Sequence, residues 1–201
     1  MPNTVKRAQP DHPVLEVIAD RWSPYVYEPR AVEREKLLTC LEAARWAASS
    51  YNEQPWSFLV AERTNTAEFE RMLSCLLEAN QGWAKNAGVL MISVVCPTFA
   101  RGNKPNRVAE HDVGLAAANF ALQAVALGLA VHQMAGVDLA KSRVTYSIPE
   151  THAPFTALAL GYTGDPAKAE VPQLAERDLA PRSRKSFADF VFAGQFRKSF
   201  T

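Results

Sequence analysis

The chain has 201 residues, of which 48% are hydrophobic and 21% are charged, and its formal net charge is +1. These values are ordinary for one globular domain with a full hydrophobic core, and they argue against a nucleic-acid-binding surface as the main function. We therefore expect a single domain over residues 1–201, in which any anion site must be local.

Residues 1–13 are polar and interrupted by proline, so they show no secretory signal, and residues 1–12 are expected to form a poorly ordered lead. The three cysteines, Cys40, Cys75 and Cys96, stand far apart without a CxxC pair. We interpret all three as buried small hydrophobic residues and expect no disulfide framework. This cysteine usage fits a reducing, cytoplasmic location.

The apolar pattern predicts an α/β fold in which helices are interleaved with strands. Helical spacing predicts helices over residues 13–20, 32–48, 66–78 and 112–128. Short apolar runs predict strands over residues 57–62, 89–95, 131–135 and 155–162. The strand at 89–95 is apolar except at Ser93 and is therefore expected to be central, in a mixed or mainly antiparallel sheet. Residues 97–107 are predicted to form a basic loop.

Residues 114–131 consist almost entirely of Ala, Leu, Val, Phe and Gly, a composition that could suggest a membrane span. Asn119 and Gln123 interrupt the run, and Ala outnumbers Leu, so insertion into lipid would be weak. The pattern favours a helix buried on every side in a globular protein. In a domain of this size, such a helix often lies at a subunit interface as well, and no membrane partner is predicted.

The chain after Val171 is long and proline-rich, but it regains apolar character at Phe187-Ala-Asp-Phe-Val-Phe. We expect residues 172–201 to form a C-terminal extension that packs on another surface, that of a partner subunit.

The most informative stretch is Ala-Ala-Ser-Ser-Tyr-Asn-Glu-Gln-Pro-Trp at residues 47–56, between a predicted helix and a predicted strand. A turn rich in small hydroxyls and amides presents hydrogen-bonding groups to a planar, polar ligand. Two basic segments lie far from it in the sequence, Arg21-Trp22-Ser23 and Arg182-Ser183-Arg184. A guanidinium can make two charge-assisted hydrogen bonds to a phosphate.

Each basic segment also has a plainer explanation. Taken alone, Arg21 is better explained as an arginine that meets the carbonyls of its own helix, and Arg182 and Arg184 as a solvated basic face. No GxGxxG follows a strand and no GxxxxGK is present, so a phosphate site would have to be built from scattered arginines.

The remaining polar residues suggest no further chemistry. No HExxH or His–Cys spacing is present, so no metal is predicted, and His111-Asp112 is interpreted as a helix cap. His132 on a short strand is expected to be a core or interface residue. No residue is assigned a catalytic role.

Four segments together resemble the nitroreductase family of FMN-dependent oxidoreductases, in order and spacing, over about residues 12–192. Arg21-Trp22-Ser23 matches the family's Arg-x-Ser, and residues 48–56 match its Pro-Ser-Ser-x-Asn-x-Gln-Pro-Trp turn. Residues 128–130 and 136–138 match Gly-Leu-Gly and Gly-Phe-Asp, and Arg182-Ser183-Arg184 matches a C-terminal Arg-x-Arg. The turn is quite specific, whereas the other segments would be weak alone.

The resemblance implies a three-layer α+β sandwich and an intertwined homodimer that binds FMN. NADH or NADPH would pass hydride to flavin N5, and a small aromatic or conjugated acceptor, such as a nitro compound or quinone, would take it in a ping-pong cycle. The turn would come from the partner subunit. The implied cofactor-binding residues are Arg21, Trp22, Ser23, Tyr25, Ser49, Ser50, Asn52, Asn80, Gln133, Met134, Ala135, Gly136, Arg182 and Arg184. Without the resemblance, Asn80 could equally be a helix C-cap, and residues 133–136 a strand end entering a turn.

Three positions depart from the family pattern. Tyr25 stands where relatives usually carry Lys or Arg near flavin N1 and O2, and a phenol brings no full charge. Trp83 stands where some relatives have Lys, and Ala48 replaces the usual Pro of the turn. We therefore expect a less easily reduced flavin or a different activity. The alternatives are an FMN carrier or sensor with little turnover, reductive dehalogenation, and oxygen-dependent flavin cleavage.

Overall fold

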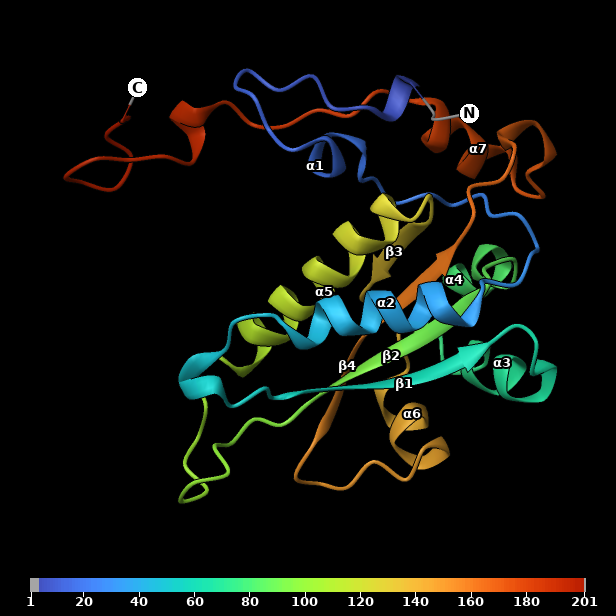
Figure 1. Cartoon of the computed structure of the whole chain (residues 1–201), viewed down its shortest axis with the longest axis horizontal. Coiled ribbons are helices and arrows are strands. Elements are labelled where there is room, and N and C mark those ends of the chain that lie inside the picture. The colour runs from blue at the N-terminus through green and yellow to red at the C-terminus, as the bar shows by residue number, and fades with distance from the viewer. Residues whose placement is uncertain (1–3, 201) are drawn as a thin grey trace.

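The computed structural model of the chain describes residues 4–200, which form a three-layer α+β sandwich (Figure 1). Its sheet has the strand order β1-β2-β4-β3, and every neighbouring pair is antiparallel. The strands are β1 (Trp56–Glu62), β2 (Val89–Val95), β3 (Ala130–Met134) and β4 (Ala153–Gly161). The predicted fold class is confirmed, and the sheet is wholly antiparallel.

Seven α-helices lie within the described residues. They are α1 (Glu16–Asp20), α2 (Arg34–Arg45), α3 (Thr66–Leu73), α4 (Glu78–Ala84), α5 (Ala109–Ala126), α6 (Leu139–Thr145) and α7 (Pro172–Leu179). Four single 3-10 turns accompany them: η1 (Thr4–Lys6), η2 (Ser50–Asn52), η3 (Pro166–Lys168) and η4 (Phe187–Asp189).

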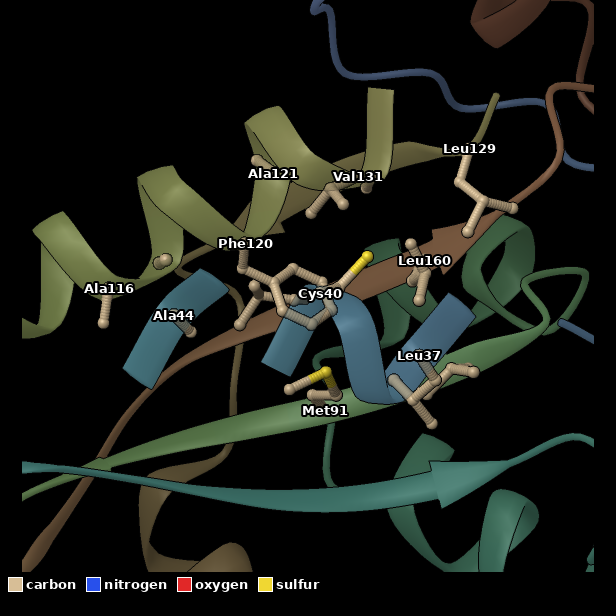
Figure 2. Packing of buried hydrophobic residues seen from close by; sticks show 14 of the residues in the cluster. Leu37, Cys40, Ala44, Met91, Ala116, Phe120, Ala121, Leu129, Val131 and Leu160 are labelled. Atoms are coloured by element: carbon tan, nitrogen blue, oxygen red, sulfur yellow. The ribbon is translucent and has the colours of Figure 1, made fainter. Parts of the chain in front are cut away.

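Helices α2 and α5 cover one face of the sheet. Figure 2 shows Leu37 and Cys40 of α2 beside Phe120 of α5, close to Met91 of β2 and Leu160 of β4. All five side chains are at least 97% buried. Because the α5 sequence is rich in alanine, whose side chain is small, the helix packs closely against α2 and the sheet.

The opposite face of the sheet carries a second apolar cluster, built with α3 and α4. Phe69 and Met72 of α3 and Trp83 of α4 pack there against Leu90 and Ile92 of β2. Since alternate residues of a strand point to opposite faces, β2 contributes to both clusters and is buried along its whole length. The predicted central strand is confirmed.

The cysteines are buried at Cys40 and Cys75, as expected, whereas Cys96 just after β2 is partly exposed. No disulfide joins these three residues.

Several predicted helix boundaries were wrong. The helix expected over 66–78 ends at Leu73, and α4, which was not predicted, begins at Glu78. The helix expected from Pro13 begins only at Glu16. Helices α6 and α7 were not predicted at all. Asp112 does not cap α5: the helix begins at Ala109, and the Asp112 carboxylate is buried in its first turn.

The two ends of the chain run side by side across the top of the molecule in Figure 1. Lys6 Nζ donates to the Arg177 carbonyl oxygen, and the His12 and Phe187 rings stack with centroids 5.3 Å apart. Of the lead expected over residues 1–12, residues 1–3 lie outside the described part. Beyond α7 the chain extends away from the sandwich.

Across residues 4–200, we find no helix that is both long and apolar enough to span a membrane.

Candidate functional site

Three guanidinium groups from the two ends of the chain lie close enough to repel one another. Arg21 follows α1, and Arg182 and Arg184 follow α7. Burial lowers the pKa of Arg21, and the charge of Arg184 lowers it further. Burial likewise lowers the pKa of Arg182, and the charges of Arg21 and Arg184 add to this effect. Such a cluster of like charges would be stabilised by a bound anion.

The Arg21 side chain points toward Ser23, since its Nη1 lies 3.4 Å from Ser23 Oγ. The carbonyls at the end of α1 are instead met by Arg182, whose Nη atoms donate to Ala19 O and Arg21 O. The plainer explanation of Arg21 is therefore wrong, because a different arginine caps the helix. Arg182 is not a solvated residue either: it is half-buried, and its Nε is fully buried with no partner among the described residues.

Arg184 is exposed and donates from Nη1 to its neighbour's carbonyl, Ser183 O, at 2.7 Å. Trp22 is half-buried, with Lys6 Nζ 5.4 Å from its ring centroid. These two residues border the cluster, and the Arg184 side chain remains free to turn toward a ligand.

Tyr25 is held at both its backbone and its phenol by α7. Its N–H donates to both carboxylate oxygens of Asp178, each at 3.0 Å, and the N–H of Val26 donates to Asp178 Oδ2 at 2.9 Å. Arg177 Nη1 donates to Tyr25 Oη at 3.0 Å. Asp178 is only 1% exposed, and burial raises the pKa of its carboxyl.

The Tyr25 ring belongs to an aromatic cluster with Trp83 and His132. The Tyr25 centroid lies 5.3 Å from that of Trp83 and 4.6 Å from that of His132. His132 Nδ1 donates to Pro24 O at 2.8 Å, and burial lowers the pKa of the imidazole. His132 is thus the packed interior residue that we predicted, and it fixes the chain just before Tyr25.

A cavity of about 430 Å³ adjoins this cluster, lined by Tyr25 and Trp83 together with residues of α4, α7 and the segment 164–171.

Asn80 and the segment after β3 contact each other directly. Asn80 is the third residue of α4, so its interpretation as a helix C-cap is wrong, and its Nδ2 donates to Gly136 O at 3.2 Å. A Cβ atom at Gly136 would lie 2.1 Å from that nitrogen, so only glycine fits this approach. Met134 points into the core, whereas Gln133 and Ala135 are exposed on the same side of the strand.

The turn at residues 49–54 has a strained backbone. Tyr51, Asn52 and Gln54 have backbone φ angles of 54°, 59° and 53°, values that residues other than glycine rarely adopt. Ser49 Oγ accepts the N–H of Gln54 at 3.0 Å. Strain concentrated in one short turn is typical of functional sites, and here it exposes the Tyr51 and Asn52 side chains.

Buried Asp112 anchors this turn to α5, because its Oδ2 accepts the N–H of Ser50 at 2.9 Å. Sequence reasoning missed this role, as it missed those of Arg177 and Asp178. A usable signal existed for Asp178: Val171, Leu174 and Asp178 follow helical spacing, which places the carboxylate on the side of α7 that faces the protein.

The turn and the guanidinium cluster lie in different parts of the molecule. In Figure 1 the turn is at the outer end of α2, where β1 begins, and the cluster is at the top, beside α1 and α7. One chain therefore brings together Arg21, Ser23, Arg182 and Arg184, places Tyr25 against α7, and brings Asn80 to Gly136. It does not bring Ser49, Ser50 and Asn52 to them.

Known proteins are similar to this chain in fold and in sequence. A solved structure described as an oxidoreductase containing FMN matches with a TM-score of 0.88 and 34% identity, over 95% of this chain and 96% of that chain. A Methanothermobacter thermautotrophicus protein described as an NADH dehydrogenase/NAD(P)H nitroreductase is 30% identical over 76% of this chain and 78% of its own. The major NAD(P)H-flavin oxidoreductase of Aliivibrio fischeri is 42% identical over 25% of this chain and 24% of its own. Because the sequence profile of the Nitroreductase family matches residues 18–162, most of its length, the chain belongs to the nitroreductase family.

Proposed function

We propose that this protein is an FMN-dependent oxidoreductase that takes hydride from NADH or NADPH and delivers it to a small aromatic or conjugated acceptor, such as a nitro compound or a quinone. Family membership supports the reaction class, and similar proteins are named for FMN, NAD(P)H and flavin. The observation that carries the proposal is the convergence of Arg21, Arg182 and Arg184, which leaves positive charge and a buried, unpaired Arg182 Nε at one place.

The residues present fit FMN. Its phosphate would meet the guanidiniums of Arg21 and Arg184 and the hydroxyl of Ser23, and Arg182 would hold that segment in place through the α1 carbonyls. Its ring system would lie against the segment Gln133–Gly136, beside Asn80, where the absence of a Gly136 side chain permits close approach. When bound, FMN supplies the hydride chemistry, so the protein needs no general base of its own.

The remaining contacts require a second copy of the chain. Ser49, Ser50 and Asn52 would reach the cofactor of the other subunit, because they lie far from the guanidinium cluster of their own. The strained, anchored turn presents its polar groups rigidly, which limits the entropy lost on binding. One open site would serve reductant and acceptor in turn, which is the basis for the proposed ping-pong cycle.

The proposal is tested by the visible spectrum of the purified protein and by anaerobic addition of NADH and then NADPH. We expect a yellow protein whose flavin absorbance bleaches within seconds with at least one nicotinamide and returns when a quinone is added. A colourless protein that does not bind added FMN would contradict the proposal.

An FMN carrier or sensor is the second candidate, favoured by Tyr25 at a position where relatives usually carry a basic residue. Such a protein would be yellow but would not bleach within seconds. Product analysis after aerobic turnover would reveal dehalogenation or flavin cleavage.

A further inference from the structure

We infer that Arg177 is a positioning residue for Tyr25 and that this pair offers a charge-assisted phenol hydrogen bond to a carbonyl oxygen of the flavin ring. The inference rests on the proposed function, since it requires FMN beside Tyr25. Its basis is the contact between a guanidinium on α7 and a phenol four residues after Arg21, in which Arg177 Nη1 and Tyr25 Oη are 3.0 Å apart.

The phenol is immobilised from several directions. Asp178 holds the backbone N–H of Tyr25, and His132 holds the preceding carbonyl, that of Pro24. The rings of Trp83 and His132 pack against the Tyr25 ring at centroid distances of 5.3 and 4.6 Å. Arg177 then fixes the oxygen itself. A donor fixed in this way stabilises charge on a ligand without reorganising during the reaction.

The hydroxyl proton of Tyr25 is left for a ligand. A phenol oxygen can accept hydrogen bonds and donate one, and Arg177 occupies an accepting position. Within residues 4–200, no group accepts a hydrogen bond from Tyr25 Oη. The contact with Arg177 polarises the O–H bond, because a cation that donates to the oxygen makes its proton a stronger donor.

The charge of Arg177 is not neutralised by an ion pair with any described carboxylate. Of its two acidic neighbours in sequence, Asp178 is turned to the backbone of Tyr25 and Val26, and Glu176 is exposed and forms no ion pair with Arg177. Lys6 contributes a further cation at this end of α7, through its bond to Arg177 O. Position 25 therefore lacks a basic side chain in the sequence, but in the fold α7 places a guanidinium against its phenol oxygen, while the Asp178 carboxylate is held at its backbone.

A donor with a cation behind it favours the reduced flavin, whose negative charge gathers on its pyrimidine carbonyl and nitrogen. The quantity to measure is thus the midpoint potential of bound FMN, together with the dissociation constant of oxidised FMN from the refolded or reconstituted apoprotein. The variants are Arg177→Gln, Arg177→Lys, Tyr25→Phe and the double variant of Arg177→Gln with Tyr25→Phe. The matched control is Lys141→Gln, which removes one exposed charge from α6, at the opposite end of the molecule from α7 in Figure 1.

We expect Arg177→Gln and Tyr25→Phe each to lower the affinity for reduced FMN relative to oxidised FMN about tenfold, which corresponds to about 30 mV for two electrons. Arg177→Lys should keep part of the effect, and Lys141→Gln none. Because Arg177 acts through Tyr25, its substitution should have a smaller effect when Tyr25 is already Phe. The affinity for oxidised FMN should change less than threefold (about 0.6 kcal/mol). A merely structural role would instead weaken the binding of oxidised and reduced FMN alike.

Equal potentials in all variants, or fully additive effects in the double variant, would overturn this inference while leaving the proposed function intact. Should Arg177→Gln fail to fold, Tyr25→Phe and Arg177→Lys still decide the question. Failure of the unmodified protein to bind FMN would overturn both the proposed function and the inference.

Discussion

At the scale of single residues, the candidate ring site depends on a glycine that faces an amide. Asn80 Nδ2 donates to Gly136 O at 3.2 Å, and this approach leaves no room for a methyl group at position 136. The amide is the end of a movable side chain, so a collision there displaces Asn80 without disturbing the core. Gly136 thus sets the position of a side chain that we propose contacts the flavin.

Gly136→Ala is expected to weaken FMN binding. The new Cβ would lie 2.1 Å from Asn80 Nδ2, so the amide must turn away and lose its hydrogen bond to Gly136 O. Such a hydrogen bond stabilises a protein by about 1 kcal/mol. We expect the FMN dissociation constant, measured by fluorescence titration of the apoprotein, to rise at least fivefold (about 1 kcal/mol).

The matched control is Gly82→Ala, on the same helix as Asn80, where a Cβ meets nothing within 4 Å. This change should leave FMN binding intact and stabilise the helix by about 0.5–1 kcal/mol, because alanine has the higher helix propensity. Equal FMN affinities for Gly136→Ala and Gly82→Ala would contradict the role assigned to Gly136.

Sequence reasoning found the arginines of the candidate site but not which contact each of them makes. Arg182 meets the carbonyls that were assigned to Arg21 in the plainer explanation, and the phenol of Tyr25 meets Arg177. These contacts join residues more than 150 positions apart. A single sequence carries no periodicity or spacing that reports such a distance.

At the scale of elements, a polar network ties the end of β4 to the start of α2. Tyr162, just after β4, donates to Glu33 at the N-cap of α2 and accepts from Lys36 Nζ at 2.7 Å. Arg30 lies over the Tyr162 ring, with Cζ 4.0 Å from the centroid. The hydrogen bond from Tyr162 is the main cause that lowers the pKa of Glu33 to about 2, and the charges of Lys36 and Arg30 add to it.

Glu33→Gln should make unfolding less sensitive to acid. Because the pKa of Glu33 is lower in the folded protein than its ordinary value of 4.5, its contribution to stability is present above about pH 4.5 and is lost as the pH falls toward 2. Urea denaturation across this range should therefore give a shallower loss of unfolding free energy for the variant than for the unmodified protein.

Tyr162→Phe should reproduce the effect, since it removes the group that lowers this pKa. The control is Glu150→Gln, because Glu150 is exposed and forms no ion pair with a described residue. An acid dependence that is the same for Glu33→Gln and the unmodified protein would show that the network does not persist in solution.

Elements with strong apolar patterns were predicted well, and short polar ones were missed. Strand β2 was predicted at its observed bounds, Val89–Val95, because six apolar residues in a run of seven leave few alternatives. Helix α6 buries only Ser142, and α7 only Asp178, so neither has the long buried apolar stripe that makes a helix easy to predict. Such helices are stabilised by tertiary contacts, which helix propensity alone does not reveal.

At the scale of the whole molecule, a single chain exposes apolar surface that a second copy would cover. Phe196 and Phe200 are 76% and 70% exposed on the extended C-terminal segment, and Trp46 beyond α2 is 74% exposed. The segment reaches away from the sandwich, and the turn at 49–54 is remote from the guanidinium cluster of its own chain. One packing partner accounts for all three features, and we therefore propose that the segment wraps a second subunit and joins two half-sites.

The double variant of Phe196→Ser and Phe200→Ser is expected to weaken a dimer of the 22.1 kDa chain. Burying one phenylalanine contributes roughly 1.5–3 kcal/mol, so losing both at each of two symmetric contacts should raise the dimer dissociation constant at least tenfold in sedimentation velocity experiments. The matched control, Arg197→Ser with Lys198→Ser, changes neighbouring residues of the same segment but removes no aromatic surface. If each cofactor is shared between subunits, FMN should dissociate from the phenylalanine variant as it is diluted below its dimer dissociation constant, because Ser49, Ser50 and Asn52 then leave the site. A 22.1 kDa species for the unmodified chain at all concentrations, or FMN affinity that is independent of dilution, would contradict the shared site.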